Sequence, residues 1–415
     1  MNSTVVAIFV IVYLGMILGG LPFLQLDRTG VALLGAIALV ATGDLTPEQA
    51  AQAIHLPTLL LLFSFMVISA QMRLGGFYAW VTLRIAALPL GPPALLAAVI
   101  AVVAVLSAVF SNDVVCLAIA PVLADICLRR RLDPVPYLLA LACAANIGSA
   151  ATLIGNPQNM LIGSVLKLPF GGYFLEAIVP VLLGLVVLWA LLAWSARGAR
   201  AAASAEALAP DRPVAPATRE EPPLDRWQTA KGLAVAAALV AIFLATDWPR
   251  EVAALAGAGV LLTSRKLHST HMLGLVDWEL LILFIGLFVV NHALQTTGLT
   301  AQAMQALTAA GLPLQEPGPM FAATLVLSNI VSNVPAVMLL LPAATEPLAG
   351  PLLALVSTLA GNLLIVGSIA NIIVVDAARR QGIVIDWRRH ARTGVPVTIA
   401  TLAITAAWLA WRLPG

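Results

Sequence analysis

Long apolar segments separated by short polar ones recur along the whole chain. A helix needs about 20 apolar residues to cross the hydrocarbon core of a bilayer. Segments near that length predict membrane spans at residues 4–22, 30–43, 57–72, 136–165, 176–195, 230–246, 251–264, 278–294, 350–378 and 394–412. The pattern therefore predicts an all-α polytopic membrane protein with about ten transmembrane spans.

Two further apolar segments, 93–128 and 318–345, are interrupted near their middle by polar residues. The first contains Ser111-Asn112-Asp113, and the second contains a polar run from Ser328 to Asn333. Each half is short for a full crossing, so we expect two re-entrant helical hairpins, although pairs of thin spans would fit the same lengths. The spans 136–165 and 350–378 each carry a glycine and an asparagine four residues apart, which predicts two broken helices.

Shared spacings indicate an internal repeat of opposite orientation. Pro121 follows Ser111 by ten residues, and Pro342 follows Ser332 by the same distance. Five crossings separate the matching features, so the second copy is expected to be inverted, as in secondary transporters. We predict a first repeat at 1–196 with its inner hairpin 93–128, a proline-rich cytoplasmic linker at 197–229, and an inverted second repeat at 230–415 with its outer hairpin 318–345.

Composition and charge agree with a membrane protein. Only 10% of the residues are charged, against roughly 25% in a soluble domain, which excludes a soluble globular protein. A formal net charge of +2 offers no footprint for nucleic acid. With the N-terminus outside and ten crossings, only Lys167, Arg250 and Arg412 of the 22 basic residues would lie outside. This bias predicts a bacterial inner-membrane protein with both termini outside.

The polar interruptions are the candidate site, because unpaired backbone inside hydrocarbon must line a cavity or be buried in protein. Asn156-Pro157 has the order of a helix N-cap and first turn, with Gly155 suited to ending the preceding half. Converging helix starts favour an anion, and freed carbonyls favour a cation. The candidate substrate- or ion-binding residues are Ser111, Asn112, Asp113, Asn146, Ser149, Thr152, Gly155, Asn156, Asn159, Ser332, Asn333, Gly367, Ser368 and Asn371.

Asp113 is the acidic residue that the pattern places near the membrane centre. An intramembrane carboxylate indicates a functional site, and sodium could bind among Ser111, Asn112, Asp113, Asn146 and Thr152. Simpler roles stay open: Asp113 as a helix cap, and Ser149, Thr152 and Ser368 as packing residues. We expect no catalytic residues and no cofactor beyond Na+ or H+ as coupling ion, since no nucleophile pairs with Asp113 in sequence and no GxxxxGK[ST] loop occurs.

These residues resemble the ion transporter superfamily of divalent anion:sodium symporters, arsenite permeases and NhaD-type antiporters. The likeness covers nearly the whole chain, is closest to bacterial citrate- or anion-transporter-like permeases, and rests on Ser111-Asn112-Asp113 with Pro121, the run from Asn146 to Asn159, and Ser332-Asn333-Val334-Pro335. It implies that hairpin tips and adjacent unwound spans bind sodium and substrate, and that a transport unit slides against a scaffold, often in a homodimer. Asp113 and Val334 replace the tip threonines of the symporters, and an Asn-Asp tip is nearer to the arsenite-permease pattern.

Together these features predict a secondary active transporter that moves a small anion or oxyanion, such as a carboxylate, across the inner membrane. Coupling to Na+ or H+ by alternating access is expected. The alternatives are a Na+/H+ antiporter, in which Asp113 exchanges both ions, and an arsenite-type efflux permease.

Overall fold

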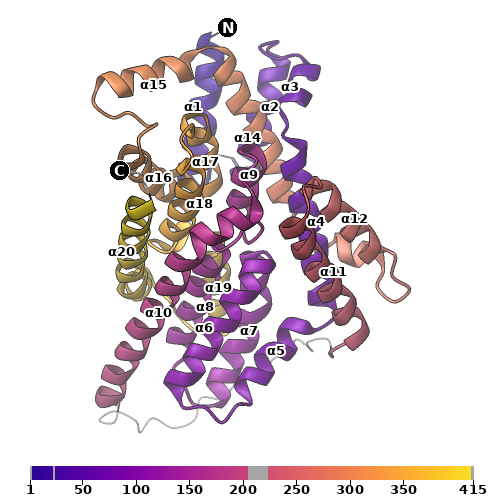
Figure 1. Ribbon diagram of the computed structural model, residues 1–415, viewed down its shortest axis with the longest axis vertical. Coiled ribbons are helices and arrows are strands. Elements are labelled where there is room, and N and C mark those ends of the chain that lie inside the picture. The colour runs from indigo at the N-terminus through magenta and orange to yellow at the C-terminus, as the bar shows by residue number, and fades with distance from the viewer. Residues whose placement is uncertain (1, 22–23, 204–222, 413–415) are drawn as a thin grey trace.

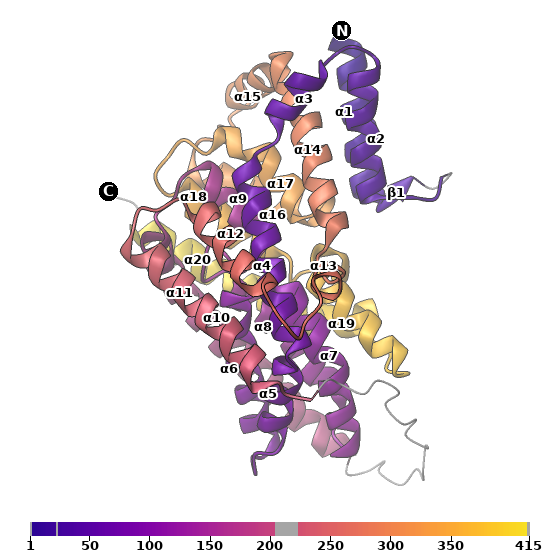
Figure 2. The same cartoon turned by 90° about the vertical axis from the view of Figure 1, so that its right-hand side faces the viewer.

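The protein is a bundle of helices of unequal length. The computed structural model describes residues 2–21, 24–203 and 223–412, and Figures 1 and 2 show it from two sides. Within these residues six helices are long and apolar enough to cross a membrane: α4 (Leu56–Leu74), α6 (Pro92–Val109), α10 (Phe170–Ala203), α11 (Arg226–Ala245), α14 (Trp278–Thr296) and α20 (Trp387–Arg412). Shorter apolar helices include α1 (Asn2–Leu18) and α2 (Arg28–Ala41). The structure is therefore that of an all-α, polytopic membrane protein.

Four apolar segments are interrupted at the places that the polar residues predicted. Helix α6 is followed after Phe110 and Ser111 by α7 (Asn112–Arg129), and α16 (Pro317–Val331) is followed after Ser332 by α17 (Asn333–Leu340). A seven-residue break at 150–156 separates α8 (Pro134–Ser149) from α9 (Pro157–Val165). A break at 361–368, which holds the 3-10 turn Ile365–Gly367, separates α18 (Ala349–Ala360) from α19 (Ile369–Arg380).

Local signals explain how the first broken helix restarts. The side chain of Asn156 accepts a hydrogen bond from the backbone N–H of Asn159, and Pro157 occupies the first helical position. The expectation that Gly155 ends the preceding half is wrong, because α8 already ends at Ser149. Gly155 instead serves close packing, since a Cβ there would lie 2.3 Å from the Ser149 carbonyl oxygen.

Several short elements were not predicted from the sequence. Helices α3 (Pro47–Ala53), α5 (Phe77–Ala86), α13 (Ser269–Leu273) and α15 (Leu299–Ala309) lie between the spans, and β1 (Gly20–Leu21) pairs with β2 (Leu26–Asp27). Helices α5 and α15 both start after a glycine of positive φ, Gly76 at 70° and Gly298 at 76°. Such a joint lets the chain turn sharply out of a long helix.

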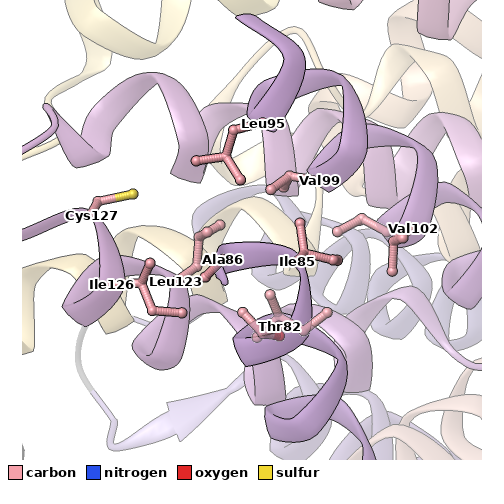
Figure 3. A pocket seen from close by; sticks show the side chains of 11 residues that line it. Thr82, Ile85, Ala86, Leu95, Val99, Val102, Leu123, Ile126 and Cys127 are labelled. Carbon is pink, nitrogen blue, oxygen red and sulfur yellow. The ribbon is translucent and has the colours of Figure 1, made fainter. Parts of the chain in front are cut away.

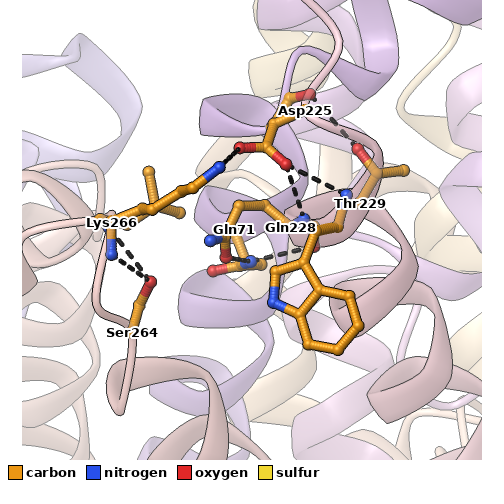
Figure 4. A network of polar contacts seen from close by, with 9 residues as sticks. Gln71, Asp225, Gln228, Thr229, Ser264 and Lys266 are labelled. Atoms are coloured by element: carbon orange, nitrogen blue, oxygen red, sulfur yellow. Dashed lines mark hydrogen bonds and ion pairs between the residues drawn. The ribbon is translucent and has the colours of Figure 1, made fainter.

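The predicted linker 197–229 is shorter than expected. Helix α10 continues to Ala203 and α11 begins at Arg226, while residues 204–222 lie outside the described part of the chain. Polar contacts fix the start of α11 to the end of α4, as Figure 4 shows. The side-chain amide of Gln71 donates to Gln228, and Asp225 caps α11 and pairs with Lys266 at 3.4 Å. The partly exposed carboxylate of Asp225 has a lowered pKa, chiefly because it accepts the Gln228 backbone N–H.

Close packing joins several pairs of helices. A Cβ on Gly148 of α8 would lie 2.4 Å from the Ala104 Cα of α6, so the two backbones are in contact. On the other side of the molecule α14 packs equally closely on α2, where a Cβ on Gly286 would lie 2.6 Å from the Ala32 carbonyl carbon. Apolar side chains fill the contact between α5, α6 and α7, where Ile85, Leu95 and Leu123 surround a gap of about 10 Å³ (Figure 3).

We predict that Gly148→Ala destabilises the protein by about 1–3 kcal/mol, because the added methyl group must push two backbones apart. Gly259→Ala is the matched control, since this helical glycine has open space around its Cβ position. Thermal unfolding of the purified protein in detergent should show a lower midpoint for the first variant only. Equal midpoints would contradict the close contact of α6 and α8.

Candidate functional site

Asn146, at the end of α8, is the centre of a buried hydrogen-bond network that joins both broken helices to one hairpin tip. Its Oδ1 accepts from Asn112 Nδ2 at 3.1 Å and from Ser368 Oγ at 2.9 Å. Its Nδ2 donates to Asn362 Oδ1 at 2.9 Å and to Asn371 Oδ1 at 3.3 Å. One side chain thus ties α7 to both sides of the second break.

Next to this network, the starts of five helices surround a polar cavity of about 30 Å³. Its walls are the first residues of α7, α9, α17 and α19, with one residue from the first turn of α14: Asn112, Asp113, Pro157, Gln158, Leu280, Ser332, Asn333, Val334, Ser368 and Ile369. Each helix start carries about half a positive charge from its free N–H groups. The cavity therefore lies where several partial positive charges converge, although no lysine or arginine lines it.

Oxygen atoms without partners also face this region. Asn112 Oδ1 and Asn333 Oδ1 are buried and accept no hydrogen bond within the described chain. The carboxylate of Asp113 lines the cavity and receives no hydrogen bond or ion pair from any residue that the structure describes. Asp277, which caps α14 by accepting the Leu280 backbone N–H, adds a second carboxylate near the cavity wall. Oxygen atoms of this kind are what a hard cation binds.

A second group of polar residues holds the first break together without lining the cavity. Ser149 accepts from Asn156 Nδ2 at 3.0 Å and donates to the Asn146 carbonyl. Asn159 Nδ2 donates to the Thr152 carbonyl at 3.0 Å, and its Oδ1 accepts from Thr358 Oγ1 at 3.3 Å. These hydrogen bonds hold the unwound backbone of the first break in its conformation.

The structure brings all the candidate residues to one region, where one set lines the cavity and the other set surrounds it. Asn112, Asp113, Ser332, Asn333 and Ser368 line the cavity. The others surround it: Asn146 and Asn371 by the network, Ser149, Thr152, Asn156 and Asn159 by the first break, Gly155 and Gly367 by close packing, and Ser111 as the N-cap of α7.

Sequence reasoning missed several residues of this region, both polar and apolar. Gln158 lines the cavity and donates to Thr358, and Asn362 bonds Asn146. The Gly361-Asn362 pair after an apolar helix was a usable signal, whereas Leu280 had none. His390 and Tyr173, at the starts of α20 and α10, contact the two breaks and were also missed.

Comparison with known proteins assigns the family. The citrate transporter family model, CitMHS, matches residues 8–360. The chain belongs to this family. It is a multi-pass membrane transporter and not an enzyme. An uncharacterized transporter of Mycobacterium tuberculosis is 31% identical over 93% of this chain and 94% of its own length.

More distant proteins agree with this assignment. The silicon efflux transporter LSI3 of Oryza sativa is 29% identical, with 92% of each chain covered. The crystal structure of the YdaH transporter of Alcanivorax borkumensis has the same fold, with a TM-score of 0.57 at 13% identity, covering 100% of this chain and 99% of the other. The resemblance inferred from the tip residues is thereby confirmed at the level of the family.

We predict that Asn146→Leu lowers the unfolding midpoint, because it leaves buried groups of Asn112, Asn362 and Ser368 without their partner. Each unsatisfied buried group costs about 1–3 kcal/mol. Thermal unfolding in detergent measures the loss. Thr42→Val, which removes an exposed hydroxyl, is the control. A midpoint equal to that of the unaltered protein would mean that Asn146 does not hold the site together.

Proposed function

We propose that the protein is a secondary transporter of a small anion or oxyanion, coupled to Na+ or H+ by alternating access. The observation that carries this proposal is the cavity at which four starts of interrupted helices meet. An anion gains from several helix N-termini at once, and their N–H groups supply hydrogen bonds without a fixed cationic side chain. This arrangement suits an anion that must be bound on one side of the membrane and released on the other.

The coupling ion is assigned to the first tip. Asp113 supplies the carboxylate, and Asn112 supplies an unpartnered oxygen. Ser111, Asn146 and Thr152, the other sodium ligands expected from the sequence, do not line the cavity, and the side-chain oxygens of Asn146 and Thr152 already form hydrogen bonds within the protein. A sodium ion or a proton bound there offsets the negative charge of Asp113, which would otherwise repel the anion. Val334 occupies the equivalent place in the second half, so a second cation site there would have only neutral oxygens.

An inverted repeat of ten spans with two re-entrant hairpins is the architecture that we propose for this function. Helices α10 and α20 run antiparallel, since Arg412 at the end of α20 pairs with Glu176 near the start of α10. The broken helices contact each other reciprocally. Asn146 at the end of α8 meets Asn371 at the start of α19, and Thr358 at the end of α18 meets Asn156 at the start of α9. Reciprocal contacts between two halves are what a two-fold axis in the membrane plane would produce.

The size of the cavity supports a moving mechanism. About 30 Å³ holds one or two water molecules or a dehydrated cation, but not a carboxylate or oxyanion. Entry of an anion therefore requires the walls to separate, as alternating access demands.

Two alternatives use the same residues. Na+/H+ exchange at Asp113 needs no anion, and it is favoured by the carboxylate that no described residue pairs. The second alternative is efflux of a neutral oxyacid or its weakly charged anion, as in an arsenite-type permease. It is favoured by the cavity lining, which contains no lysine or arginine among the described residues, and by the likeness to a silicon efflux transporter.

Liposomes with the purified protein separate these functions. We expect a sodium or pH gradient to drive uptake of a labelled anion, with citrate, phosphate and arsenite as probes. Exchange of sodium for protons without any of these solutes would establish the antiporter and reject the anion transporter.

Asp113→Asn should lower gradient-driven transport at least about tenfold, because a neutral amide no longer balances the coupling ion. Asp376→Asn is the matched control, since that carboxylate is exposed and pairs only with Arg380 on the same helix face. Retention of gradient-driven rates in Asp113→Asn would exclude this carboxylate from coupling.

A further inference from the structure

Tyr173 and His390 occupy equivalent positions in two helices that both pass beside a break. Each is the fourth residue of its helix, Tyr173 in α10 and His390 in α20. Each side chain is 2% exposed. In the proposed repeat, α10 and α20 are the final spans of the two halves, so the two residues correspond.

Each side chain bonds the end of the first half of a broken helix. Tyr173 donates from its hydroxyl to the Ala150 carbonyl at 2.7 Å, and Ala150 directly follows α8. His390 Nε2 lies 3.1 Å from the carbonyl of Asn362, two residues after the end of α18. A carbonyl oxygen only accepts, so the hydrogen of the bond is carried by Nε2. Ala150 is the C-cap residue of α8, and Asn362 directly follows Gly361, the C-cap residue of α18. Each bond therefore gives a partner to a carbonyl at the point where the first half of a broken helix has ended.

Both contacts lead directly to the site. The Tyr173 hydroxyl also accepts from Asn159 Nδ2 at 3.1 Å, and it thereby spans the first break from α8 to α9. Asn362, held through its backbone by His390, bonds Asn146 through its side chain. Helix α20 approaches this loop so closely that a Cβ on Gly394 would lie 2.4 Å from the Asn362 carbonyl oxygen.

We propose that Tyr173 and His390 are a matched pair of positioning residues, each of which caps one broken helix and fixes the unwound backbone beside the cavity. They act through the backbone and do not line the cavity. Their effect on transport rests on the proposed function, whereas their effect on the two loops does not.

Hydrogen exchange of the full-length protein in detergent tests the capping directly. Tyr173→Phe removes only the hydroxyl, and we expect amides at 150–156 to exchange about five- to tenfold faster, with 361–368 unchanged. His390→Leu should give the reverse pattern. His390→Gln, which keeps an N–H donor on a side chain of similar reach, should restore slow exchange at 361–368.

Tyr13→Phe is the matched control, because it removes the hydroxyl of another buried tyrosine, which bonds Asn291 instead. It should leave both loops unchanged. General destabilisation by Tyr173→Phe would accelerate both loops equally, and an unchanged 150–156 loop would show that the hydroxyl does not cap α8. Either result overturns the proposal, as would failure of His390→Gln to restore what His390→Leu loses.

Transport provides a second readout. If the liposome assay finds an anion, both loosened variants should raise its KM about fivefold or more with little change in maximal rate, since a mobile site binds less well but still moves. A lowered maximal rate at constant KM would overturn the positioning role. If no anion is transported, the proposed function fails, and hydrogen exchange still decides the capping.

Discussion

Every interruption of a helix within apolar surroundings leaves backbone N–H and C=O groups that the protein must satisfy itself. The four interruptions of this chain are gathered around one cavity, and hydrogen bonds link three of them to one another. Asn112 donates its backbone N–H to the Gly155 carbonyl in the first break, and Asn146 donates its side-chain amide to Asn371 beside the second break. This mutual pairing explains why asparagine is so frequent here: a single amide both donates and accepts.

The same constraint separates the groups that hold the site from those that are free to bind. Asn146 uses both ends of its amide within the protein, and so does Asn159. Asn112 and Asn333 each retain an oxygen without a partner, and both line the cavity beside Asp113. The rigid network thus presents a small number of free oxygens among helix N-termini, which is the general plan of a preorganised site.

The sequence predicted what depends on local signals. The tips at Asn112 and Asn333 followed from polar residues within apolar segments, and the restart at Pro157 followed from its cap and proline. The family followed from the same residues. It could not predict α5 and α15, which at 10 and 11 residues are too short to be recognised as spans, or the tertiary partners Tyr173, His390 and Leu280. These three are brought to the site by packing between helices that are far apart in the chain. The residues next to them in the sequence do not indicate that contact.

The position of Leu280 relates the cavity to helix α14. Nine of the ten residues around the cavity belong to the interrupted segments, and only Leu280 comes from α14, which packs chiefly on α1 and α2 at one end of the molecule (Figure 2). The cavity therefore lies at the boundary between α14 and the interrupted segments. A shift of α14 along the interrupted segments would move the Leu280 side chain away from the cavity while the nine residues of the interrupted segments stay together.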